Sequence, residues 1–260
     1  MDVVGDLLDR DRRSREVALV TGDGRERTYR DLITNAYKAG NVLRYLGVRA
    51  GATVAAEPTP TLHTTLAFLG AAGVGAPVRF DPEAGVERGD RVVLVAVADE
   101  AATEPAPGTN LAVFGGPPER PETTHWEQEL WSENPGMPPS SVAPGDPVLR
   151  GTGGGGPNGS DGASGGSGDV SHRALLAAAA SVVDERGLEP GDRVVIRGDL
   201  ADPRALAAGV VAPLAAGATA VLSGEGAGAD APTVTVGKNG SENADDGGSE
   251  SVTLPSVRDR

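Results

Sequence analysis

The spacing of apolar residues predicts helices and strands in alternation along the chain. From Tyr29 to Leu46, apolar side chains recur every three or four positions, which is the period of a helix with one buried face, and Gly47 follows as a usual helix end. Trp126 and Trp131 are expected to pack a proline-rich connector against the sheet. The other predicted elements are a helix at 2–9, strands at 16–21, 25–29, 91–98 and 111–114, and a short helix at 123–133.

One pattern is present at 48–80 and again at 188–222. Each copy has a turn with glycine, a short apolar strand, a loop with proline, a helix rich in alanine and leucine, a Gly-Ala pair and a second apolar strand. A strand–helix–strand unit of this kind joins parallel strands by a right-handed crossover. The predicted fold class is therefore α/β and layered, with a largely parallel sheet flanked by helices.

Composition divides the chain near residue 224. Residues 1–224 are predicted to form the α/β domain, with a flexible glycine-rich loop at 151–168. Residues 225–260 are polar and acidic and are predicted to form a largely disordered tail.

The charge balance restricts the partners and the environment. The 260 residues carry a formal net charge of −14, which argues against nucleic acid or an anionic membrane as a partner, because both are bound by positive surfaces. Lysine occurs only at positions 38 and 238. High acidity with little lysine is typical of a high-salt, haloarchaeal cytoplasm, where carboxylates are screened; a GC-rich genome combined with an acidic tail is the alternative. The absence of cysteine excludes disulfides and thiolate ligands.

The chain is expected to be soluble and cytoplasmic. Its first residues lack the apolar run of a signal peptide. Two uncharged stretches, 58–78 and 205–222, approach the length of a membrane span, but proline or glycine interrupts both, and each fits better as helix, turn and strand.

The segment 151–168 is the main candidate for chemistry. Ten of its eighteen residues are glycine, and it lies between a short apolar strand and a helix-like stretch at 170–183. A strand, a glycine-rich loop and a helix in this order cradle phosphates, because backbone N–H groups and the helix N-terminus face the anion. Such loops usually add a lysine, and Asn158 occupies that place here.

Three segments, 27–51, 66–80 and 124–154, are similar in pattern and order to the adenylate-forming, AMP-binding family that includes acyl-CoA and acetyl-CoA synthetases. The resemblance covers roughly residues 5–222. It implies the fold of the family's N-terminal domain, acid–CoA ligase chemistry, and ATP or AMP with Mg²⁺ as ligands. The family's later motifs for adenine, Mg²⁺, ribose and the catalytic lysine have no match after residue 222, so the chain is expected to be a shortened N-terminal portion.

The resemblance also supplies the candidate cofactor-binding residues. The family's loop reads Ser-Gly-Thr-Thr-Gly-x-Pro-Lys-Gly, and the matching positions are Gly151, Thr152, Gly153, Gly154, Pro157 and Gly159. Arg150 replaces the serine and Asn158 replaces the lysine. Loss of the lysine removes a charge-assisted contact worth roughly 1.5–3 kcal/mol. The loop is therefore expected to bind phosphate weakly, or to act only as a flexible linker.

No catalytic residue and no metal site are predicted. His63, His125 and His172 lie far apart in the sequence, so no set of metal ligands is evident. His172, near a helix start, is expected on the surface or as a cap. Arg150 is expected to be a solvated residue at a strand end, and the alternative is that it replaces the lost lysine charge.

Three functions stay open at this point. The first is a degenerate, non-catalytic protein with a binding or regulatory role. The second is one subunit of a split acyl-CoA synthetase, with a protein partner that supplies the C-terminal half. The third is an active ATP-dependent ligase that adenylates a carboxylate, which rests on the resemblance alone. The first is preferred, because adenylation needs positive charge around a polyphosphate transition state.

Overall fold

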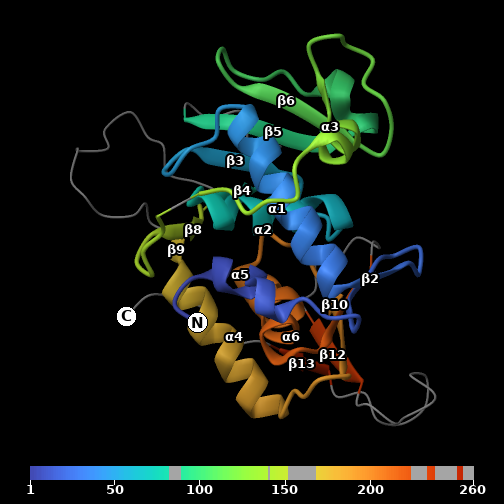
Figure 1. Cartoon of the computed structure of the whole chain (residues 1–260), viewed down its shortest axis with the longest axis vertical. Coiled ribbons are helices and arrows are strands. Elements are labelled where there is room, and N and C mark those ends of the chain that lie inside the picture. The colour runs from blue at the N-terminus through green and yellow to red at the C-terminus, as the bar shows by residue number, and fades with distance from the viewer. Residues whose placement is uncertain (82–88, 140, 152–167, 224–232, 238–250, 254–260) are drawn as a thin grey trace.

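The computed structural model describes residues 1–81, 89–139, 141–151, 168–223, 233–237 and 251–253. Its strands form two sheets, and helices lie between the sheets and outside them (Figure 1). The layered α/β class with mostly parallel strands, flanked by helices, is confirmed. The strands, however, divide between two sheets rather than forming one.

The larger sheet contains seven strands in the order β7-β6-β5-β3-β4-β8-β9. Neighbouring strands from β7 to β8 are parallel, and β9 pairs antiparallel with β8. The central strands are apolar on both faces, as parallel strands covered on both sides usually are. The strands are β3 (Thr53–Ala56), β4 (Val78–Phe80), β5 (Asp90–Ala96), β6 (Asn110–Phe114), β7 (Thr124–His125), β8 (Pro147–Leu149) and β9 (Val170–Ser171).

The smaller sheet has six strands in the order β13-β12-β10-β11-β1-β2. β10, β11 and β1 are parallel, whereas β2 and the β12–β13 pair run antiparallel to their neighbours. The strands are β1 (Val17–Val20), β2 (Glu26–Thr28), β10 (Arg193–Arg197), β11 (Thr219–Leu222), β12 (Thr233–Gly237) and β13 (Ser251–Thr253). β12 and β13 fall within the predicted tail 225–260, whose other residues lie outside the described part, so a domain boundary at residue 224 stays a prediction.

Both predicted strand–helix–strand units are present, and both join parallel strands. In the first unit, α2 (Leu62–Val74) connects β3 to β4. In the second unit the helix between β10 and β11 is divided into α5 (Pro203–Leu206), a π-helical turn (Ala207–Val211) and α6 (Ala212–Ala216). Pro213 has no N–H to donate to the carbonyl of Gly209, and this gap in the ladder accounts for the irregular turn.

The layer between the sheets consists of α1 (Tyr29–Tyr45) and α2. α1 packs against β1 and β2 of the smaller sheet, whereas α2 packs against β3 and β4 of the larger one. α1 begins at a reciprocal cap: the Asp31 N–H donates to the hydroxyl of Thr28, and the Thr28 N–H donates to the carboxylate of Asp31. The two helices thus connect the sheets through their own contact.

That contact is made by backbone. A Cβ placed on Gly70 of α2 would lie 2.6 Å from the backbone N of Gly40 on α1 and 2.9 Å from the Cβ of Ala39. No side chain fits at Gly70 between helices that approach so closely, so this position needs glycine for space rather than for conformational freedom.

We expect the substitution Gly70→Ala to destabilise the protein by about 2 kcal/mol, because the added methyl group must push α1 away from α2. Urea unfolding followed by circular dichroism measures this loss. Gly73→Ala is the matched control, since a Cβ there meets its nearest atom, Cδ1 of Leu8, at 3.8 Å. Equal effects of the two substitutions would contradict the proposed backbone contact.

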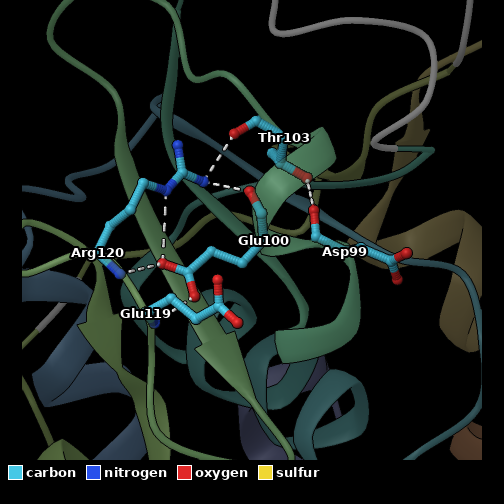
Figure 2. A network of polar contacts seen from close by, with 5 residues as sticks. All are labelled: Asp99, Glu100, Thr103, Glu119 and Arg120. Carbon is cyan, nitrogen blue, oxygen red and sulfur yellow. Dashed lines mark hydrogen bonds and ion pairs between the residues drawn. The ribbon is translucent and has the colours of Figure 1, made fainter.

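The outer face of the larger sheet has its own apolar cluster and a polar network beside it. Val97, at the start of the 3-10 helix Val97–Ala102, packs against that cluster. Figure 2 shows how the buried Glu100 fastens this helix to the loop after β6: its carboxylate accepts hydrogen bonds from the N–H groups of Glu119 and Arg120 at 2.7 and 3.0 Å. Burial opposes the charged form, but these donors outweigh it and lower the pKa of Glu100 to about 2.

The two tryptophans behave differently. Trp126 opens α3 (Trp126–Ser132) and is fully buried, as expected. Trp131 is 87% exposed, so the expectation that it packs the connector against the sheet is wrong. Leu130, rather than Trp131, faces the core, because Trp126 and Leu130 lie one turn apart on the same side of α3. In the described residues, no helix has both the length and the apolar character needed to cross a membrane.

Candidate phosphate-loop site

The glycine-rich segment leaves the larger sheet at the end of β8 and returns at β9. Its two ends touch: a Cβ on Gly151 would lie 2.8 Å from the Cα of Gly168. The Gly151 N–H also donates to the carboxylate of Asp169 at 3.3 Å. Of the predicted cofactor-binding residues the structure describes only Gly151; Thr152, Gly153, Gly154, Pro157 and Gly159 lie outside the described residues, as does Asn158.

The helix that follows the loop is α4 (His172–Arg186), as the sequence predicted. Its first N–H groups already have acceptors within the protein. The N–H of His172 donates to the carbonyl of Asp146 at 3.1 Å, and that of Arg173 donates to the carbonyl of Pro144 at 2.9 Å. The N–H of Ala174 donates to the hydroxyl of Ser171 at 3.2 Å. These groups are therefore not free to receive a phosphate, contrary to the expected role of the helix N-terminus.

His172 is fully buried, so its expected place on the surface or as a cap is wrong. Its Nδ1 accepts a hydrogen bond from the N–H of Val4 at 3.1 Å, which attaches the N-terminal 3-10 helix Val4–Leu8 to the start of α4. Burial lowers the pKa of His172 to about 4. The spacing of His172, Leu175 and Ala179 along α4 places all three on one buried face, which is the signal that sequence reasoning overlooked.

Arg150 is exposed at the end of β8, in agreement with the expected strand-end position. Its N–H donates to the carbonyl of Val78 at 2.9 Å and continues the pairing with β4. Its guanidinium approaches the carbonyl of Gly51 at 3.4 Å. The side chain is therefore directed toward the turn before β3.

A second group of polar side chains lies where β6 and β7 end. The carboxylate of Glu127 is 3.6 Å from Nε2 of His63 and 3.6 Å from Nε2 of His125. The His63 ring stacks on Phe114 with ring centroids 4.9 Å apart. Burial lowers the pKa of His63, although the Glu127 carboxylate opposes the shift. The sequence did not predict that His63 and His125 share one carboxylate, because the two histidines are far apart in the sequence and meet only in the folded protein.

Within the described part of the chain, no group of three or more His, Asp or Glu side chains has the arrangement to hold a metal ion. His63, His125 and Glu127 are included in that statement.

Comparison with solved structures identifies proteins of the same fold. The anthranilate CoA ligase AuaEII, solved with anthranoyl-AMP, superposes with a TM-score of 0.69 at 22% identity over 85% of this chain. An acyl-CoA synthetase from Brucella canis gives 0.68 at 23% identity over 88% of this chain, and the N-terminal domain of FACL13 from Mycobacterium tuberculosis gives 0.67 at 19% identity over 85%. At these identities the likeness shows a shared fold.

The matched part is about half of the larger proteins. This chain spans 44% of AuaEII, 44% of the Brucella canis enzyme and 56% of the FACL13 domain. No protein-family model matches the sequence, and a sequence comparison with curated proteins finds no match. The fold thus agrees with the one that the sequence resemblance implied.

Proposed function

We propose that this chain is a degenerate, AMP-binding ligase-like protein that does not adenylate a carboxylate by itself and has a binding or regulatory role. The fold shared with CoA ligases supports the ancestry. The observation that carries the loss of activity is the altered loop: Asn158 replaces the lysine that the resemblance implies, and the first three N–H groups of α4 are already bonded.

The described residues bring the two ends of the loop together at Gly151 and Gly168. The Gly151 N–H already donates to the carboxylate of Asp169, as the first N–H groups of α4 donate within the protein, so a phosphate would have to replace such a bond to use them. Contacts to ATP or AMP would then come from the backbone of the loop itself, with Gly151, Thr152, Gly153, Gly154, Pro157 and Gly159 as the proposed residues and Mg²⁺ held by the nucleotide phosphates. Without the lysine charge, such binding is weak.

Restoring the lysine tests this proposal. We expect the wild-type protein to bind MgATP weakly in calorimetric titration, and the substitution Asn158→Lys to increase the affinity by about 10- to 100-fold, because a charge-assisted contact is regained. The titration is made in concentrated KCl, in which an acidic protein of this composition is expected to be stable.

Ser160→Lys is the matched control for that experiment, since it adds the same charge two residues further along the loop. Equal gains in the two variants would indicate a general charge effect. Tight MgATP binding by the wild-type chain, together with release of pyrophosphate in the presence of a carboxylic acid, would overturn the proposal in favour of an active ligase.

A protein partner is the second candidate, and the shared length favours it. The chain spans 44% of AuaEII, so a complete adenylation site of that kind would need further polypeptide. The test is pyrophosphate release by complexes isolated under native conditions in high salt, compared with release by the chain alone. Activity only in a complex would support a split ligase, whereas inactive complexes would favour the binding or regulatory role.

A further inference from the structure

We propose a second anion-binding site, distinct from the glycine-rich loop, that takes a small ligand bearing two or more phosphate groups. It is a pocket of about 510 Å³ between the N-terminal segment and the first turns of α1, closed on a third side by the loop after α3. It does not depend on the function proposed above. Its lining residues are Arg10, Arg13, Arg30, Thr34, Asn134, Pro135 and Gly136.

Three arginines line this one pocket in a chain with a formal net charge of −14. Some other arginines of the described chain pair with carboxylates, as Arg79 does with Asp90 and Arg193 with Glu26. None of the three pocket arginines forms an ion pair with a described carboxylate. Like charges that gather without a counter-charge repel one another, so the arrangement favours a bound anion.

The side chain of Arg13 is held against the protein where it lines the pocket. Its Nε and Nη2 atoms are buried and have no hydrogen-bond partner among the described residues. The guanidinium lies over the ring of Tyr37, 5.1 Å from the ring centroid, and this stacking fixes its plane. An oxyanion in the pocket would bind to a guanidinium that is already held in place.

The remaining walls are also held in place. Arg30 and Thr34 are four residues apart on α1, so their side chains lie on one face of the helix. The opposite wall is fixed to α1 by the side-chain amide of Asn41, which donates to the carbonyls of Asn134 and Gly136 at 3.1 and 2.8 Å. The site is therefore formed before a ligand arrives.

The chemistry of the walls selects the ligand class. Guanidinium forks match the paired oxygens of phosphate groups, and the hydroxyl of Thr34 adds a neutral donor. A single phosphate would leave most of a 510 Å³ pocket to water. A ligand with two or more linked phosphates would contact the three charges together.

The test is calorimetric titration with inorganic pyrophosphate, and with orthophosphate for comparison, in potassium glutamate so that chloride does not compete. We expect one pyrophosphate per chain, bound more tightly than orthophosphate. Arg10→Gln and Arg30→Gln should each weaken binding by about tenfold, because each removes one charge-assisted contact. Both side chains are exposed, so neither substitution should disturb the fold. Circular dichroism of each variant checks this.

Arg15→Gln is the matched control: it removes the same charge from an exposed residue in the same segment that does not line the pocket. Arg13→Lys keeps the charge but loses the fork, and should also weaken binding. Equal losses in the Arg15, Arg10 and Arg30 variants would overturn the proposal. If neither Arg10→Gln nor Arg30→Gln changes the affinity for pyrophosphate, the anion binds elsewhere, for example at the glycine-rich loop. That result would also overturn the proposal.

Discussion

Replacing Arg79 with methionine is expected to cost about 3–5 kcal/mol of unfolding free energy. Arg79 on β4 and Asp90 on β5 form an ion pair across β3, and their residues are only 1% and 6% exposed. The guanidinium also donates to the carbonyl of Asp81 at 2.8 Å. Without Arg79 the carboxylate of Asp90 stays buried but loses this ion pair, and that loss causes most of the destabilisation. Urea unfolding at fixed salt measures it.

An exposed ion pair provides the control for Arg79. Arg193 and Glu26 approach to 2.9 Å, but their side chains are about half exposed, so Arg193→Met should cost less than about 1 kcal/mol. The double variant Arg79→Met with Asp90→Leu should regain most of the stability, because it removes both charges of this buried pair together. A cost of Arg79→Met no greater than that of Arg193→Met would show that the buried pair does not stabilise the sheet in this way.

The second large effect concerns acid stability and His172. Its pKa is lowered to about 4 in the folded protein, compared with an ordinary value of 6.5. Between pH 6.5 and about pH 4, His172 therefore binds a proton in the unfolded chain but stays neutral in the folded protein. The stabilisation is complete above pH 6.5 and is lost as the pH falls toward 4, by about 2–3 kcal/mol in all. The main reason is burial, which disfavours the charged ring; a ring protonated at Nδ1 also cannot accept the hydrogen bond from Val4.

The variant His172→Asn isolates this contribution from that of the many carboxylates. The amide oxygen of asparagine can take the place of Nδ1 as acceptor, but the side chain does not titrate. Unfolding free energies are measured by urea titration from pH 7 to pH 4.5 for both proteins. The wild-type curve should fall by about 2–3 kcal/mol more than that of the variant. Parallel curves would show that His172 does not govern the acid sensitivity.

The sequence predicted local elements well because their signals are local. The apolar spacing of α1 and the order strand–helix–strand around α2 both follow from periodicities read within a few turns. The division into two sheets could not be predicted in this way, since β1 pairs with β11 and β4 with β8 across long stretches of chain. The buried ion pair of Arg79 and Asp90 could not be predicted for the same reason, because the strands that carry the two residues, β4 and β5, lie on opposite sides of β3 in the sheet.

The candidate site could be predicted in its outline but not in its hydrogen bonding. The strand before the loop and the helix after it are where the sequence placed them. The acceptors that occupy the α4 N–H groups are the carbonyls of Pro144 and Asp146, and backbone carbonyls carry no sequence signal. The arginine pocket was not predicted because Arg10 and Arg30 meet only when the chain folds back onto α1.

The pairing of β1 with β11 also determines when the fold can be completed during synthesis. Leu19 pairs with Ala220, and the hydroxyl of Tyr29 donates to the carbonyl of Ala218 at 2.7 Å. A ribosome adding about 5–20 residues per second needs roughly 10–40 s to make the 200 or so residues that separate these partners. During that time the apolar strand β1 has no parallel neighbour. The nascent chain is therefore most open to misfolding, and to capture by chaperones, at its N-terminal end.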